Sequence, residues 1–341
     1  MTSHGYLKAA TECSGIYGSN SPFSIFLCDI NDNVADINGG GIYCSTSAAT
    51  ISICTVSNNT ANDGGGINLE YSAGNSEDAA VLNLVLITNN TAENYGGGIF
   101  VTYSYAWITN CIISGNSADF GGGIRVMRYL SPATINQPAV INSIIDNNTA
   151  DYGAGADLYS SIANFTNSTF YGNTAVYSGG GVRLYIGVPI ITNTILWNDS
   201  PSEIDIVSGD ILVMYSNVQG GGTDNNNLNS DPLFVDPANN DFHLSAGSPC
   251  IDRGTSDNAP TEDIFGTARW DDPDTPNDDA GGAFPYYDIG AIEYYPQCRC
   301  DLEPAEGDGD VDGADLAAYM ADDGGISIAE FAAEFGKDDC P

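Results

Sequence analysis

The chain has 341 residues, of which 45 are aspartate or glutamate and only 8 are lysine or arginine, so the formal net charge is −37. A surface of this sign repels phosphate backbones and anionic lipid headgroups, which excludes nucleic-acid binding and favours cations and solubility. Two histidines, His4 and His243, are too few for a histidine-based zinc site or catalytic triad. No apolar stretch approaches the roughly 18 residues of a membrane span.

The chain begins without the apolar core of a signal peptide in residues 1–12, and a repeat is already under way at residues 13–16. We therefore expect a fragment or mature portion whose export signal is not present in this sequence. Nine cysteines in an acidic, asparagine-rich chain favour an oxidising extracellular setting. A disulfide is expected among Cys298, Cys300 and Cys340, whereas Cys44 is expected to be an unpaired apolar filler.

Six glycine clusters recur at intervals of 25 to 32 residues, each after an Asn-Thr-Ala-like triplet. They begin at Gly39, Gly64, Gly96, Gly121, Gly153 and Gly179. An apolar–variable–apolar run follows each cluster and a second apolar run precedes each triplet, so one repeat holds at least two short strands and no helical period. Such a unit is too short for a propeller blade of about 40 residues, which indicates a parallel β-helix with one coil per repeat.

Stacked coils predict columns of equivalent side chains about 4.8 Å apart. The triplets predict an inward asparagine ladder of Asn59, Asn90, Asn116, Asn148 and Asn173. A second amide column is predicted at Asn110, Asn142, Asn167 and Asn193, and an aromatic stack at Tyr95, Phe120, Tyr152 and Tyr177. Cys28 and Cys54, each five residues before a ladder position, are expected on adjacent coils.

The repeats resemble right-handed parallel β-helix proteins of the pectin-lyase-like class. The glycine clusters are similar to the GGA[IL] repeats of bacterial polymorphic surface proteins, whose FxxN element is partly matched at residues 170–173. The resemblance covers residues 1–219 and implies an all-β fold, a right-handed parallel β-helix solenoid.

The variable residues after the glycines form an outward column in which Arg125, Asp157 and Arg183 stand on consecutive coils. In the polysaccharide lyases that the fold resembles, an arginine or lysine abstracts a sugar proton while calcium neutralises the uronate. These three residues are therefore the candidate catalytic group, and nearby tyrosines are candidates for stacking on sugar rings. The tyrosines are Tyr103, Tyr129, Tyr159 and Tyr185. The favoured alternative is a cross-strand salt-bridge ladder, because only Asp157 supplies a carboxylate there.

The repeat stops after residue 219, and four blocks follow in order. They are residues 230–237, 242–254, 263–269 and 288–294. These blocks resemble the choice-of-anchor module that ends many bacterial β-helix surface proteins. We expect residues 220–297 to cap the solenoid, because an open last coil exposes strand edges.

The tail, residues 298–341, contains an EF-hand-like pattern. With Asp308 at loop position 5, Gly309 takes position 6 and Asp315 position 12. The frame recurs at Asp323 and Glu330, which resembles a dockerin-like pair of calcium loops with short α-helices at residues 316–320 and 331–335. The implied calcium ligands are Asp308, Asp310, Asp312, Asp315, Asp323 and Glu330.

Three functions follow as hypotheses. The preferred one is a secreted or cell-surface β-helix protein that binds a polysaccharide or cell-surface glycan and has no catalysis of its own, with the tail as a calcium-dependent anchoring or docking module. The second is a polysaccharide lyase or glycoside hydrolase acting on acidic polysaccharide along the outer face. The third is a structural subunit of an extracellular appendage, built by end-to-end contacts.

Overall fold

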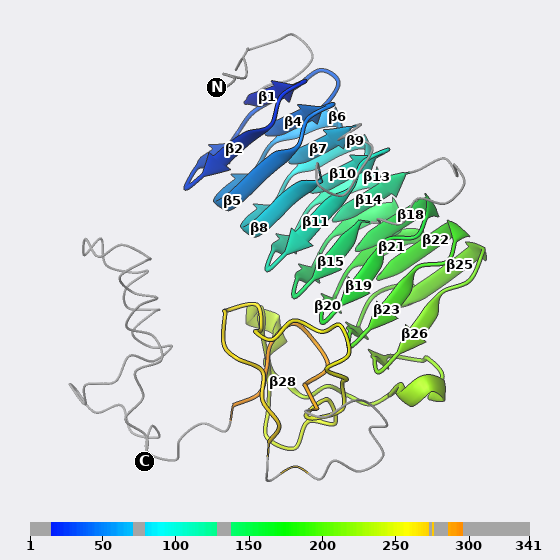
Figure 1. Ribbon diagram of the computed structural model, residues 1–341. Coiled ribbons are helices and arrows are strands. Elements are labelled where there is room, and N and C mark those ends of the chain that lie inside the picture. The colour runs from blue at the N-terminus through cyan, green and yellow to red at the C-terminus, as the bar shows by residue number, and fades with distance from the viewer. Residues whose placement is uncertain (1–14, 71–78, 128–137, 273–274, 276–285, 296–341) are drawn as a thin grey trace, which may run out of the picture. The chain divides into compact units, whose positions relative to one another are not determined.

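The computed structural model describes residues 15–70, 79–127, 138–272, 275 and 286–295. Short strands lie coil upon coil and form three parallel sheets (Figure 1). The predicted all-β parallel β-helix is therefore confirmed. The tail with its expected calcium loops and helices lies outside the described residues.

Two of the sheets flank each glycine corner. Sheet I, which follows the corner, consists of β1 (Ile16–Ser19), β4 (Ile42–Ser45), β7 (Ile67–Glu70), β10 (Ile99–Thr102), β14 (Ile124–Met127), β18 (Ala156–Ser161), β22 (Val182–Gly187) and β25 (Ile204–Ser208). Sheet III, which precedes it, consists of β6 (Thr60–Asp63), β9 (Thr91–Tyr95), β13 (Ser117–Phe120), β17 (Thr149–Tyr152) and β21 (Thr174–Ser178).

Sheet II is bent, and most coils contribute two strands to it. Its strands are β2 (Phe23–Phe26), β3 (Asp29–Asn31), β5 (Ala49–Ser57), β8 (Ala80–Thr88), β11 (Ala106–Thr109), β12 (Ile112–Ser114), β15 (Ala139–Ile141), β16 (Ile144–Asp146), β19 (Asn164–Thr166), β20 (Thr169–Tyr171), β23 (Ile190–Thr192), β24 (Ile195–Trp197), β26 (Leu212–Met214) and β27 (Asn217–Val218). The bend is the residue with φ near +50° in each coil, for example Leu84 (55°) and Asn142 (47°).

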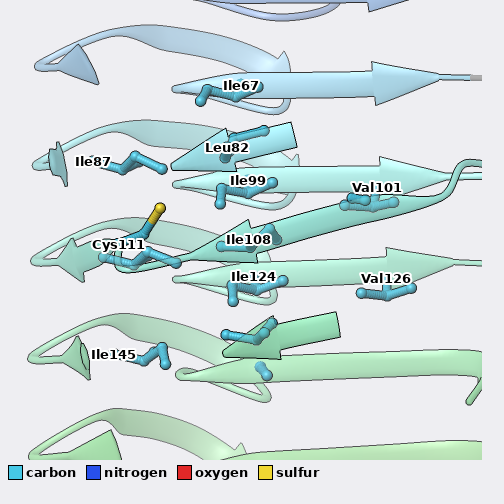
Figure 2. Packing of buried hydrophobic residues seen from close by; sticks show 14 of the residues in the cluster. Ile67, Leu82, Ile87, Ile99, Val101, Ile108, Cys111, Ile124, Val126 and Ile145 are labelled. Atoms are coloured by element: carbon cyan, nitrogen blue, oxygen red, sulfur yellow. The ribbon is translucent and has the colours of Figure 1, made fainter. Parts of the chain in front are cut away.

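The core lies between the sheets and is built from the inward residues of the alternating runs. Figure 2 shows Ile67, Ile99 and Ile124 stacked on successive coils, with Leu82 and Ile108 facing them from sheet II. All five are fully buried. Because each coil alone leaves its apolar side open, stacking supplies the burial that a single repeat lacks.

The predicted asparagine ladder is confirmed. In Asn116 the backbone N–H and the side-chain Nδ2 donate to Oδ1 of Asn148 at 2.9 and 3.0 Å, and Nδ2 also donates to the carbonyl of Ile87 at 2.9 Å. The same pair of bonds to the next coil recurs from Asn33 to Asn173. Buried amides are thus satisfied in a way that also fixes the register of each coil on its neighbour.

Glycine is required at the corner for two different reasons. The first glycine has positive φ, as at Gly96 (64°). The third glycine has no room for a side chain: a Cβ on Gly98 would lie 2.7 Å from the carbonyl oxygen of Gly123 and 3.0 Å from Nδ2 of Asn116. The third position therefore stays glycine wherever another coil follows.

The described cysteines are all free thiols. Cys44 is fully buried, as expected for an apolar filler, and the pairing of Asp29 with Thr55 places Cys28 and Cys54 on adjacent coils. A stabilising disulfide is not found in the part of the chain that the structure describes; Cys298, Cys300 and Cys340 lie outside it.

The segment after residue 219 closes the last coil only in part. The backbone N–H groups of Tyr215 and Val218 donate to the carbonyls of Asn225 and Leu228 at 3.1 and 2.9 Å, so the 3-10 turn η2 (Asp224–Asn226) and the residues after it cover the edge of sheet II. The rest, which includes the hairpin β28 (Phe234–Asp236) and β29 (Asp241–Leu244) with the 3-10 turn η3 (Pro237–Asn239), packs elsewhere.

The expected cap at the end of the solenoid is not confirmed for most of this segment. Its apolar residues pack against the outer side of sheet II, where Ile144 and Ile195 point outward. The second amide column serves as the attachment line: Asn142 Nδ2 donates to Glu262 O at 2.6 Å and Asn193 Nδ2 to Thr255 O at 2.7 Å. Burial of the outward isoleucines stabilises the fold more than cover over the strand edge would, because apolar area dominates the free energy gained on burial.

No helix long and apolar enough to cross a membrane is present among the described residues.

We predict that Asn116→Ala lowers the free energy of unfolding by about 3–5 kcal/mol, because it leaves several buried partners on two neighbouring coils without hydrogen bonds. Urea unfolding measured by circular dichroism checks this. Asn31→Ala, an exposed asparagine on β3, is the matched control and should change stability by less than about 0.5 kcal/mol. Equal effects of the two substitutions would contradict the role of the ladder.

Candidate functional site

The predicted outward column on sheet I exists as a continuous register. Arg125 is paired with Asp157, Asp157 with Arg183, and Arg183 with Asp205. The sequence analysis missed Asp205, because β25 follows Glu203 rather than a glycine cluster. Four charged side chains of alternating sign therefore lie side by side, and we call them the charge ladder.

The charge ladder is internally paired. The Arg125 guanidinium pairs with the Asp157 carboxylate, Arg183 Nη1 lies 3.0 Å from Asp157 Oδ1, and Arg183 Nε lies 4.0 Å from Asp205 Oδ2. Asp157 is fully buried and Arg125 is 4% exposed. A buried carboxylate between two guanidiniums is stable only as a set, since loss of one partner leaves an uncompensated charge.

Aromatic rings enclose the arginines from the side of sheet III. The predicted stack is confirmed, with ring centroids 5.8 Å apart for Tyr95–Phe120, 5.1 Å for Phe120–Tyr152 and 5.0 Å for Tyr152–Tyr177. The Arg125 guanidinium carbon lies 5.3 Å from the centroids of the Tyr95 and Phe120 rings. Desolvated cation–π contacts of this kind contribute up to about 2 kcal/mol each.

Burial lowers the pKa of Arg125 to about 10. This direction is the one that a catalytic base requires, because a neutral guanidine can accept a proton. Geometry opposes the role: the guanidinium is enclosed by the rings and paired with Asp157, so a base at this position has little contact with bulk solvent. The arrangement supports a structural ladder more strongly than proton abstraction.

The candidate sugar-stacking tyrosines occupy different settings. Tyr159 and Tyr185 stack on each other, with centroids 5.0 Å apart and an interplanar angle of 3°. Tyr103 lies at a bend with φ of 51°, and Tyr129 is outside the described residues. The most exposed ring on this side is Tyr177, at 61%, which ends the aromatic stack.

The described residues contain no group of three or more histidine, cysteine, aspartate or glutamate side chains arranged to hold a metal ion. The six calcium ligands expected in the tail, Asp308, Asp310, Asp312, Asp315, Asp323 and Glu330, lie outside those residues.

The asparagine ladder ends in a pair of acids that the sequence analysis missed. Asp199 takes the ladder position of the last coil, where its Oδ1 accepts from the backbone N–H and Nδ2 of Asn173 at 2.7 and 2.8 Å. Glu203 stands at the third-glycine position, and its Oε1 accepts from the Asp199 N–H at 3.1 Å. Glu203 thus supplies the acceptor that the next coil would provide. A signal was available for Asp199 alone, which follows Asn173 by 26 residues and so keeps the repeat period, whereas Glu203 comes 4 residues after Asp199 instead of the 7 or 8 that separate each ladder asparagine from its third glycine.

Burial raises the pKa of Asp199 well above its ordinary value, and the neighbouring charge of Glu203 raises it further. Burial also raises the pKa of Glu203. The folded state therefore favours a protonated Asp199 to higher pH than the unfolded chain does. Beside the pair lies a hollow of about 410 Å³ lined by Glu203, Ile204, Val213, Val218 and residues 220–222 among others.

Comparison with known families matches residues 40–219, more than half of the chain, to the right handed beta helix region. Residues 28–45, which contain the first glycine cluster, match the Chlamydia polymorphic membrane protein repeat. Comparisons with curated proteins and with solved structures give no match.

We predict that Asp199→Asn stabilises the protein increasingly as pH rises. The raised pKa means that the folded state binds more protons than the unfolded state, so the wild type loses stability as pH rises above about 4. An asparagine needs no proton to continue the ladder. The gain in free energy of unfolding should be smallest at pH 4 and reach about 1–3 kcal/mol at pH 8.

Urea unfolding at several pH values measures this difference. Asp36→Asn, at an exposed aspartate, is the control for the loss of one negative charge. A gain for Asp199→Asn that does not change with pH, or one that Asp36→Asn reproduces, would contradict the raised pKa of Asp199.

Proposed function

Because the chain belongs to the family of right-handed β-helix regions, we propose that it is a secreted or cell-surface protein that binds glycans on the outside of its coils without catalysis of its own. The match of residues 28–45 to a repeat of chlamydial polymorphic membrane proteins supports the surface location. The net charge of −37 is also consistent with a secreted or cell-surface protein, since such a charge favours solubility and disfavours binding to nucleic acid.

The observation that carries this proposal is the charge ladder on sheet I. Its arginines are already neutralised by Asp157 and Asp205 and enclosed by rings, so they offer little to a uronate or to a sugar proton. What this side presents instead is aromatic surface, of which Tyr177 is the most exposed part. Ring faces stack on the C–H groups of sugars without needing charge. The proposed ligand is therefore an uncharged glycan.

One observation favours the lyase as a second candidate, namely the lowered pKa of Arg125. The appendage subunit has less support. A further coil stacked in register would collide with the side chain of Glu203, which occupies a position held by glycine wherever a coil follows.

We predict that the full chain binds at least one member of an array of neutral oligosaccharides. Tyr177→Ala should lower the affinity for the tightest-binding member at least tenfold, because it removes the exposed end of the aromatic stack. Titration of that ligand measures the change. Phe265→Ala, which removes an equally exposed ring in the C-terminal segment, is the control and should leave affinity unchanged.

Two results would count against the proposal. One is the absence of any neutral glycan ligand. The other is the release of unsaturated products from an acidic polysaccharide, measured by their absorbance with and without calcium. If Arg183→Ala abolishes this release, the protein is a lyase.

We further propose that the tail binds calcium and docks the protein to a partner. Calorimetric titration of the full chain should show calcium uptake that Asp308→Asn with Asp312→Asn removes, because both aspartates lie in the loop that carries more of the calcium-ligand pattern. Asp36→Asn with Asp210→Asn, two exposed aspartates, controls for general attraction to an acidic surface. Equal loss in both double variants would refute a specific site.

A further inference from the structure

The outer side of sheet II is divided between a covered and an uncovered half. The C-terminal segment covers the coils that carry Asn142 and Asn193 at the bend. The earlier coils carry large apolar side chains that remain exposed. They are Phe26 (57%), Leu27 (63%), Leu84 (45%), Leu86 (39%) and Trp107 (39%), and we call this surface the bare face.

The bend in the early coils consists of residues for which a left-handed backbone conformation is unfavourable. Leu27, Ile53 and Leu84 have φ of 52°, 52° and 55°. Left-handed backbone costs a branched residue roughly 1–2 kcal/mol, and asparagine, which fills the bend in the coils from Asn110 to Asn193, tolerates it better. Exposed apolar side chains held at an unfavourable backbone position point to a use other than stability.

The bare face continues an interface that the molecule already uses. Leu86 is paired directly with Ile112 of the next coil, and Ile112 packs against the cluster of Phe242, Ile264 and Ile292 in the C-terminal segment. Val81 is likewise paired with Trp107. The same side of the solenoid therefore binds polypeptide in its later coils and ends in uncovered apolar residues in its earlier ones.

The C-terminal segment itself does not suit the bare face. Its hydrogen bonds go to bend asparagines, including Arg269 Nη2 to Asn142 Oδ1 at 3.0 Å and Thr255 N to Asn193 Oδ1 at 2.9 Å. The early bends offer leucine and isoleucine, which accept no hydrogen bonds. The occupant must therefore be held by apolar contact.

Charge restricts the occupant further. The described residues include no exposed lysine or arginine: Arg125, Arg183 and Arg269 are in ion pairs, and Arg253 is half-buried. A second copy would bring a net charge of −37 against the same charge. A segment that carries lysine or arginine beside its apolar side chains would instead be attracted.

Area also argues against a second copy. With large side chains offering on the order of 150–250 Å² each, the exposed fractions on the bare face amount to roughly 350–600 Å². A stable interface uses about 800 Å² per partner. The available surface fits one short segment better than a subunit.

From these observations we infer that the bare face binds a short segment of a partner protein that bears apolar side chains flanked by lysine or arginine. This site lies on sheet II, away from the aromatic stack of sheet III to which glycan binding is ascribed, so the two proposals stand or fall separately.

The test uses the full chain and three labelled peptides in fluorescence anisotropy at physiological salt. One peptide has leucine and lysine in an amphipathic pattern, one replaces lysine by glutamate, and one replaces leucine by serine. We expect the leucine–lysine peptide to bind at least tenfold more tightly than either of the others, because both apolar contact and charge are needed.

Leu84→Asn with Leu86→Thr is the decisive variant, because Asn167 and Thr169 occupy the same two columns on a later coil, so the fold accepts this pair. This variant should lower the affinity for the leucine–lysine peptide at least tenfold. Val176→Ser with Val188→Ser removes two apolar side chains elsewhere that are more exposed than Leu84 and Leu86, and it should leave the affinity for this peptide unchanged.

Three outcomes would overturn the inference. Unchanged affinity in the Leu84→Asn, Leu86→Thr variant would mean that the peptide is held by charge alone. Equal binding of the glutamate peptide would remove the requirement for a basic partner. If sedimentation shows that the wild type is a dimer and that the variant is a monomer, the occupant of the bare face would be a second copy of this chain.

Discussion

The hydrogen bonds of the buried asparagine ladder determine most other features of this molecule. Each ladder asparagine receives two bonds from the preceding coil and gives two to the next, so a shift of one residue would leave buried amides unsatisfied on both sides. This fixed register aligns every other column, including the isoleucines of the core and the aromatic stack beside the corner. The third glycine is part of the same constraint, since its missing side chain is the space that the neighbouring amide occupies.

A protein with this excess of acids must place its few cations carefully. Of the described arginines, Arg125, Arg183 and Arg269 are in buried or half-buried ion pairs. Such pairs recover little net free energy against desolvation, but they are specific, because breaking one leaves a charge in a medium of low dielectric. The charge ladder is thus better understood as a determinant of register on the outside of sheet I than as a reactive group.

The last coil shows how the same positions end the solenoid. Asp199 and Glu203 replace an asparagine and a glycine, and Glu203 bonds back to Asp199 where another coil would otherwise bond. The end is therefore satisfied from within the chain, which leaves the C-terminal segment free to pack on the side of sheet II. That placement divides sheet II into a covered half and the bare face.

The repeat in the sequence determined the coils, the asparagine ladder, the aromatic stack and the neighbours in the charge ladder, because each depends only on position within the repeat. Residues outside the period were harder to interpret. Asp199 keeps the repeat period but changes its residue type, and Glu203 departs from the spacing as well. The place of residues 220–295 is set by which outward surface is apolar. Burial of Arg125 and exposure of Leu84 were likewise decided by the tertiary structure, since both residues point away from the core and only the groups packed around them determine whether water reaches them.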